Sequence, residues 1–171
     1  MTVKTVTIRD DVTAPELVNE LKSIAENVLI DIEKYKNPTF GVPTRSANNI
    51  IYDSRKDVIH MGKNVSKREF HNTGTVTAFT QMLFIMSVLQ EAADSSKHLT
   101  KREIFYQDPV LFNKDQKTSD NLIEDIAVTV GVTRPCLQVV AAAKGVCIGD
   151  LTLKEGDDVF NCNELGRGGW S

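Results

Sequence analysis

An arginine and a tyrosine four residues apart are the first feature of this sequence that could carry out chemistry. Residues 100–112 read TKREIFYQDPVLF, with Arg102 and Tyr106 at positions i and i+4. In a helix these positions lie on one face, with Cβ atoms about 5–6 Å apart. A guanidinium can hold a phosphate and stabilise a phenolate, so this pair could attack a phosphodiester.

The same spacing also fits an amphipathic helix that packs the ring of Tyr106 into the core and leaves Arg102 in solvent. An arginine four residues before a tyrosine is a common coincidence. The spacing alone therefore favours packing over catalysis.

The composition is that of an ordinary globular protein. The 171 residues are 41% hydrophobic and 25% charged, which predicts one domain, or one domain with an extension. The first residues, MTVKTVTIRDD, lack the apolar core of a signal peptide, so we expect an intracellular protein. The apolar runs are too short to cross a bilayer, and we expect no membrane partner. The three cysteines are widely spaced, which argues against a zinc site or a disulfide framework.

The charge is unevenly distributed along the chain. The net charge is −3, but residues 36–149 hold fourteen Lys and Arg against eleven Asp and Glu. The acidic excess lies at the two ends. This asymmetry points weakly to a nucleic-acid partner.

The first third of the chain predicts a helix and a β hairpin. Residues 14–36 repeat apolar side chains at three- and four-residue steps, with Thr13 or Asp11 as the cap and Pro15 in the first turn. The segment NPTFGVP then breaks the helix. We therefore expect a helical extension over residues 1–45. NNIIYD and DVIHMG predict two strands joined by a tight turn.

The rest of the chain predicts a winged helix over residues 46–171, which makes the protein α+β. Helices are expected at about 74–95, 100–106 and 119–131, the last capped by Ser119 or Asp120 and ended by Gly131. CLQVVAA and CIGDLTL then predict two strands with AKG between them. A helix-turn-helix followed by a β hairpin is the order of a winged helix.

A winged helix usually meets DNA through its third helix and its wing. The polar face of the predicted third helix is acidic, so base readout by this helix is not expected. Lys144 at the wing tip, with Gly145 allowing close approach, fits a phosphate contact better. Arg134 and Lys101 are the other candidate DNA contacts.

Residues 100–151 resemble the winged-helix domain of the meiotic double-strand-break transesterases and of the A subunits of DNA topoisomerase VI. The family pattern is an Arg four residues before a Tyr that follows another aromatic residue, then L-F, a D-N-x-I-x-D-I helix, an Arg, and an A-x-K-G-x-x-x-G wing. The matching residues are Arg102, Phe105, Tyr106, Leu111, Phe112, Asp120, Asn121, Ile123, Asp125, Ile126, Arg134, Lys144, Gly145 and Gly149. With NPTF-x-x-P-x-R and, after the hairpin, VSKREFHNTG upstream, the resemblance covers about residues 14–170.

The resemblance implies that Tyr106 is the nucleophile. Tyr106 would attack a DNA phosphodiester and form a 5′-phosphotyrosyl link, with Arg102 on the scissile phosphate. One tyrosine cuts one strand, so a double-strand break needs two copies of the chain. The family also implies a B-type partner, which the N-terminal helix is a candidate to bind. The C-terminal tail is closer to eukaryotic members, which favours a nuclear location; an archaeal protein would act in the cytoplasm at the nucleoid.

The family's metal-binding domain, of the Toprim type, is not found in these residues. That domain holds Mg²⁺ through a Glu and an Asp-x-Asp pair, and no Asp-x-Asp occurs among the 171 residues. The resemblance thus places magnesium outside this chain, and we expect the chain alone to cleave DNA poorly or not at all.

Two functions remain open from the sequence. The first is the nucleophile domain of a DNA-cleaving transesterase, active in meiotic recombination or in topoisomerase VI-type strand passage. The second is a non-catalytic winged-helix module that binds DNA or a protein partner. The resemblance favours the first.

Overall fold

The computed structural model describes residues 6–141, 149–155 and 158–161. The chain divides into two compact units, residues 1–140 and 141–171. The predicted boundary between residues 45 and 46 falls within the first unit. Each unit is described by itself.

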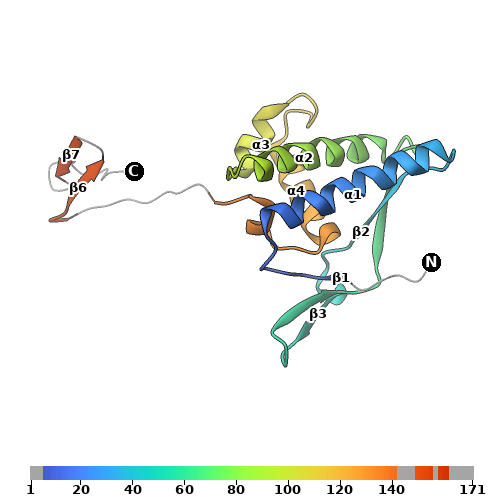
Figure 1. Ribbon diagram of the computed structural model, residues 1–171, viewed down its shortest axis with the longest axis horizontal. Helices are drawn as coiled ribbons and strands as arrows, with labels where there is room; N and C mark the ends of the chain where they lie inside the picture. The colour runs from blue at the N-terminus through green and yellow to red at the C-terminus, as the bar shows by residue number, and fades with distance from the viewer. Residues whose placement is uncertain (1–5, 142–148, 156–157, 162–171) are drawn as a thin grey trace. The chain divides into compact units, whose positions relative to one another are not determined.

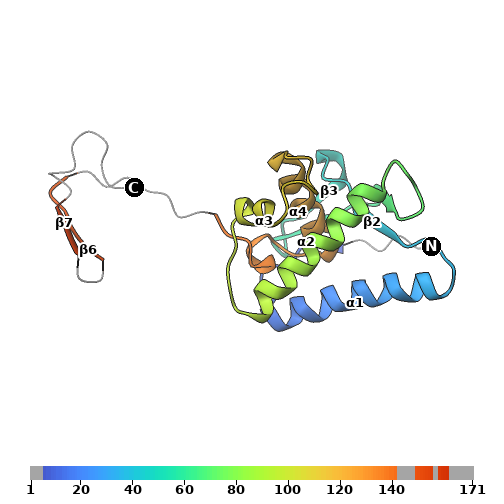
Figure 2. The same ribbon diagram turned by 90° about the horizontal axis from the view of Figure 1, so that it is seen from above.

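Helix α2, Val76–Asp94, is the central element of the first unit (Figures 1 and 2). Helices α1, Ala14–Glu33, and α4, Gln116–Val130, both pack against it. The largest fully buried side chains come from these three helices, from the residues between α2 and α4, and from the segment that follows α4: Phe79, Phe112, Leu17, Met82, Ile85, Leu89, Ile104, Ile123, Ile126, Leu137, Val132 and Val139. Burying one such side chain stabilises the fold by about 1.5–3 kcal/mol.

The predicted core helix at 74–95 is confirmed in α2 to within two residues at each end. By length and composition alone α2 could also cross a membrane, since it has 19 residues and a mean hydropathy of 1.3. The core helix of a soluble protein meets the same test. Here α2 is covered by α1, α4 and the strand β5, Val65–Glu69, so its apolar surface has partners within the fold.

The predicted N-terminal helix is also present, but it ends at Glu33 rather than at residue 36. Thr13 is its cap, and the backbone N–H of Thr13 donates to the Glu16 carboxylate at 2.8 Å. The helix stops because Tyr35 adopts a left-handed conformation with φ of 52°. Only the first half of α1 is deeply buried, through Leu17, Val18 and Leu21.

Two small antiparallel sheets complete the first unit. The predicted hairpin is confirmed as β3, Ile50–Asp53, and β4, Val58–Met61, and β1, Val6–Thr7, joins the other side of β4. The second sheet pairs β2, Thr39–Pro43, with β5. The segment NPTFGVP therefore does more than break a helix, because Phe40 and Val42 alternate into the core and Phe40 stacks on Phe79 at 4.5 Å.

The helix-turn-helix region follows the sequence prediction closely. The short helix α3 is Lys101–Gln107, and α4 ends at Gly131, which has φ of 80° and caps it as predicted. The predicted cap of α4 was wrong. The side chain of Asp115 accepts from the backbone N–H of Lys117 at 3.1 Å, so the helix begins one turn earlier, at Gln116.

The first predicted wing strand was also wrong in its first half. Residues Pro135–Leu137 form a 3-10 turn, and Gln138 reverses the chain with φ of 63°. Val139 then makes an isolated parallel bridge to Leu99. A proline at the start of the turn and a buried Leu137 favour this tight turn over an extended strand.

The described residues of the second unit, 149–155 and 158–161, form an antiparallel hairpin. Its strands are β6, Thr152–Glu155, and β7, Asp158–Asn161, paired in the register Thr152 with Asn161 and Glu155 with Asp158. The predicted second wing strand, residues 147–153, overlaps β6 only at its end. The predicted wing tip lies outside the described residues, so the α+β class is established and the winged helix stays a prediction.

We predict that Gly131→Ala destabilises the protein by about 1–2 kcal/mol or more, because Gly131 is left-handed. An added Cβ would also lie 2.8 Å from Val6 Cγ1 and 2.9 Å from Thr7 O. Urea denaturation measures the change, with Gly74→Ala as the control, since Gly74 has no positive φ and its Cβ would meet only the Asn72 side chain at 3.3 Å. Equal stability of the two variants would contradict the prediction.

Candidate functional site

Arg102 and Tyr106 meet on the exposed face of α3. Arg102 donates to the phenol oxygen of Tyr106 from Nη2 at 2.9 Å and from Nε at 3.1 Å. Tyr106 is 55% exposed. The phenol oxygen thus accepts two hydrogen bonds from a permanent cation and stays open to a ligand from solvent.

The burial of α3 explains why Tyr106 points outward. Ile104 and Phe105 are buried on its inner face, and the ring of Phe105 contacts Phe112 with centroids 6.3 Å apart. The Thr100 side chain accepts from the backbone N–H of Glu103 and caps the helix. The packing interpretation of Tyr106 is thus excluded, because Phe105 fills the core in its place.

Glu124 of α4 forms ion pairs with two of the residues that were predicted to contact DNA. Its Oε1 atom lies 2.6 Å from Lys101 Nζ and 3.3 Å from Arg134 Nη1. Burial by itself raises the pKa of Glu124, but the hydrogen bonds and charges of Lys101 and Arg134 outweigh it, and the net direction is downward. A single ionised carboxylate therefore holds Lys101 and Arg134 together, and Lys101 directly precedes Arg102.

Asp125 plays a corresponding part on the other side of α4. Its two oxygens lie 3.0 Å from Arg45 Nε and 3.5 Å from Arg68 Nη2. Two of the acidic side chains of α4 are therefore neutralised in the structure. Glu124 and Asp125 are each shared by two cations, so these two carboxylates are outnumbered by the four basic side chains that contact them.

The sequence placed Glu124 on the acidic face of the predicted third helix but did not indicate its ion pairs, and it gave no role to Arg45 or Arg68. Glu124 falls at a variable position of the family pattern, so no motif marked it. Arg45 and Arg68 are 23 residues apart and far from α4 in sequence, and only the pairing of β2 with β5 brings them to it. The remaining predicted contacts, Lys144 and Gly145, lie outside the described residues.

The described residues do not fit a magnesium site. Among them, no three His, Cys, Asp or Glu side chains gather closely enough to hold a metal ion. The adjacent carboxylates Glu124 and Asp125 are each paired with cations instead.

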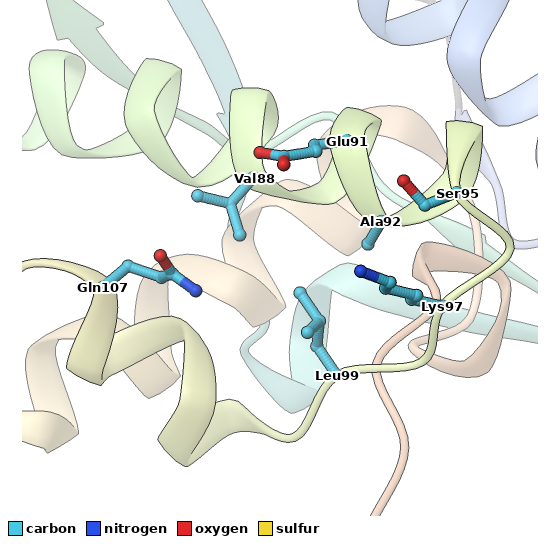
Figure 3. A pocket seen from close by; sticks show the side chains of 7 residues that line it. All are labelled: Val88, Glu91, Ala92, Ser95, Lys97, Leu99 and Gln107. Carbon is cyan, nitrogen blue, oxygen red and sulfur yellow. The ribbon is translucent and has the colours of Figure 1, made fainter.

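A small pocket beside α3 is less suited to phosphate chemistry than the face of α3 that carries Arg102 and Tyr106. It measures about 150 Å³ and lies between the end of α2 and α3 (Figure 3), lined by Val88, Glu91, Ala92, Ser95, Lys97, Leu99 and Gln107. It offers one acid and one base, and Tyr106 is not part of its lining. The exposed Arg102 and Tyr106 face is therefore the stronger candidate.

This chain is similar in sequence to type IIB DNA topoisomerases and to A subunits of DNA topoisomerase 6. A family model described as type IIB DNA topoisomerase matches residues 77–139, which include α3 and α4. The A subunit of type 2 DNA topoisomerase 6 from Pyrococcus abyssi is 33% identical over 163 residues. The A3 subunit of DNA topoisomerase 6 from Oryza sativa subsp. indica and the A subunit of the Arabidopsis thaliana enzyme are 37% and 34% identical over 131 residues.

The similarity covers most of this chain and a smaller part of each relative. The Pyrococcus match spans 91% of the chain and 43% of that protein. The two plant matches span 77% of the chain and 29% and 30% of those proteins. The chain thus spans less than half the length of the curated relatives it matches.

We predict that Glu124→Gln lowers the free energy of unfolding by about 1 kcal/mol or less near neutral pH, since the ion pairs are partly exposed. The pKa of Glu124 is lowered in the folded state, so its contribution is present above its ordinary value of 4.5 and lost as the pH falls through the folded value. Urea denaturation at several pH values measures this. Glu91→Gln, at an exposed site on α2, is the control. A difference between the two variants that persists in acid would contradict the prediction.

Proposed function

Since this chain belongs to the family of A subunits of DNA topoisomerase VI, the type IIB DNA topoisomerases, we propose that it carries the DNA-cleaving nucleophile of such an enzyme. The observation that carries the proposal is Tyr106, exposed on α3 with its phenol oxygen held by two donors of Arg102. The family match covers this helix.

The proposed reaction is a transesterification. The Tyr106 Oη atom loses its proton and attacks a backbone phosphorus of DNA. The new P–O bond to tyrosine forms as the P–O3′ bond breaks, and the leaving 3′ oxygen takes up a proton. The products are a 5′-phosphotyrosyl link and a free 3′-hydroxyl. No oxidant or external energy source is needed, because one phosphodiester replaces another.

Arg102 assists at two points in this scheme. Its guanidinium stabilises the phenolate before attack and the charge on the phosphate oxygens in the transition state. Lys101 and Arg134, aligned by Glu124, contact neighbouring backbone phosphates. Lys144 and Gly145 serve the same purpose on the wing of the proposed winged helix.

The proposed enzyme needs more than this chain. A double-strand break requires two tyrosines, so the working form is a dimer on double-stranded DNA. Magnesium, which the family resemblance places on a metal-binding domain, would supply further charge stabilisation from outside the described residues. The break serves either meiotic recombination or strand passage. The relatives occur in an archaeon and in plants, and a nuclear location follows if this chain is eukaryotic.

Helix α1 is the proposed contact for a B-type partner of the enzyme. Its second half carries apolar side chains that the first unit does not cover: Leu29 is 59% exposed, Ile32 49%, and the adjacent Tyr35 98%. An exposed apolar stripe at one end of a helix is typical of a protein-binding surface. This partner proposal rests on the family resemblance together with that exposure.

The alternative function is a module that binds DNA or a protein without cleaving DNA. The pairing of cations around α4 supports DNA binding whether or not Tyr106 reacts. The two functions predict different effects of removing the phenol oxygen of Tyr106: only the nucleophile function predicts that a covalent link to DNA is lost.

We predict that Tyr106→Phe abolishes the covalent DNA–protein adduct in an assembly that contains this chain, a metal-binding domain and Mg²⁺. Tyr52→Phe is the matched control, because Tyr52 is 59% exposed but hydrogen-bonded to Asp57 at 2.6 Å. Denaturing gels with end-labelled duplex detect the adduct and show which DNA end carries the protein. An adduct that survives Tyr106→Phe would disprove the proposed nucleophile.

The binding module predicts a different pattern. Lys144→Ala is then expected to weaken DNA binding and to make the slope of log K against log salt shallower by about 0.9 for one lost phosphate contact. Under that function Tyr106→Phe leaves all measured activity intact. Anisotropy titrations with a labelled duplex at several salt concentrations measure the slope.

A further inference from the structure

A groove on the first unit lies between the β2 and β5 sheet and α4. It measures about 600 Å³ and is lined by Val42, Pro43, Thr44, Arg45, Ser66, Arg68, Asn121 and Asp125. Two guanidinium groups and the polar groups of Thr44, Ser66 and Asn121 face one hollow. A lining this rich in hydrogen-bond donors is suited to an anion.

In the groove, the carboxylate side chain is more deeply buried than the two arginine side chains. The Asp125 side chain is 14% exposed, whereas those of Arg45 and Arg68 are 38% and 24% exposed. Asp125 thus offsets one positive charge and orients both guanidinium groups. The net charge of the three side chains is positive and lies on the solvent side.

Each arginine keeps donors for a ligand. Arg45 uses Nε for Asp125 and Nη2 for the backbone oxygen of Asn121, and its Nη1 atom makes no hydrogen bond to the described residues. Arg68 donates from Nη1 to Ser66 Oγ at 2.6 Å and to the backbone oxygen of Lys67 at 3.5 Å, and places Nη2 3.5 Å from Asp125. Its Nε atom makes no hydrogen bond to the residues that the structure describes. A phosphate can bind two guanidinium groups held in this way.

The position of the groove on α4 points to the ligand. At about 100° per residue, Lys117, Asn121, Glu124 and Asp125 lie along one stripe of α4, and Lys117 and Asn121 are exposed. The cations Lys101 and Arg134 flank this stripe at Glu124, and Arg45 and Arg68 flank it at Asp125. Cations on both flanks of one partly exposed stripe match a ligand with repeated negative charges.

We propose that the groove binds a backbone phosphate of double-stranded DNA, at a site separate from Arg102 and Tyr106. Arg45 and Arg68 bind the phosphate, and Asp125 positions the two arginines. The DNA then crosses this stripe of α4 over the exposed Lys117 and Asn121 and is held on both sides of it. This inference rests on the proposed function, because it takes DNA as the substrate.

The test compares DNA binding by variants of this 171-residue chain. Removing both arginines alone would leave the largely buried Asp125 without a cation, so the test variant is Arg45→Gln/Arg68→Gln/Asp125→Asn. Asp125→Asn alone is its reference, because it keeps both arginines. Arg55→Gln/Lys56→Gln, in the turn between β3 and β4, removes two cations outside the groove. Anisotropy titrations of a labelled duplex from about 50 to 200 mM salt give the slope for each protein.

We expect the triple variant to bind more weakly than Asp125→Asn, with a slope shallower by about 0.9 for each lost phosphate contact. The Arg55 and Lys56 variant keeps the wild-type slope. If the wild type binds DNA but the triple variant and Asp125→Asn give equal slopes, the inference about the groove is overturned and the proposed function is not. Failure of the wild-type chain to bind DNA at all would overturn this inference, whereas the proposed function is overturned only by an adduct that survives Tyr106→Phe.

A second measurement avoids any loss of folding in the variants. Phenylglyoxal modifies accessible guanidinium groups, and mass spectrometry locates the modified arginines in the wild-type chain. We expect added duplex to protect Arg45 and Arg68 and to leave Arg55 reactive. Reaction of Arg45 and Arg68 at the same rate with and without duplex, in a chain that binds it, would overturn the inference.

Discussion

The burial of Ile104 and Phe105 is the constraint on which the candidate site depends. Helix α3 has seven residues, too few to be stable by itself, so its orientation comes from its inner face. Ile104 and Phe105 lie in the same core as α2 and α4. Helical geometry then places Arg102 and Tyr106 on the outer face, one turn apart. The reactive pair is exposed because its neighbours in sequence are buried.

Helix α4 organises the charges around that pair. Its inner face, with Leu122, Ile123 and Ile126, anchors it in the core, and its outer face carries Glu124 and Asp125. Each carboxylate is shared by two cations from other elements. Isolated surface ion pairs contribute little to stability, so the consequence of this arrangement is mainly positional. Four long basic side chains are held in defined places with donors left for an anion.

Much of the fold could be predicted because it depends on local patterns. Apolar periodicity located α1, α2 and the β3–β4 hairpin, and Gly131 marked the end of α4. The predictions were wrong where a neighbouring cap or turn is more stable than the predicted one. Asp115 capped α4 one turn before the predicted caps, and Pro135 with Gln138 turned the chain where a strand was expected. The strand β2 was missed because two prolines and a glycine hid the alternation of Phe40 and Val42.

The sequence by itself determined the chemistry that is available: a tyrosine four residues after an arginine, within a pattern shared by one family. Side-chain spacing along one helix is local, so it can be read without a structure. The tertiary structure decided which charges act together. Arg45, Arg68, Lys101 and Arg134 come from four separate segments, and only packing around α4 brings them to Glu124 and Asp125. Contacts between distant segments depend on how the whole core packs, and no local pattern encodes them.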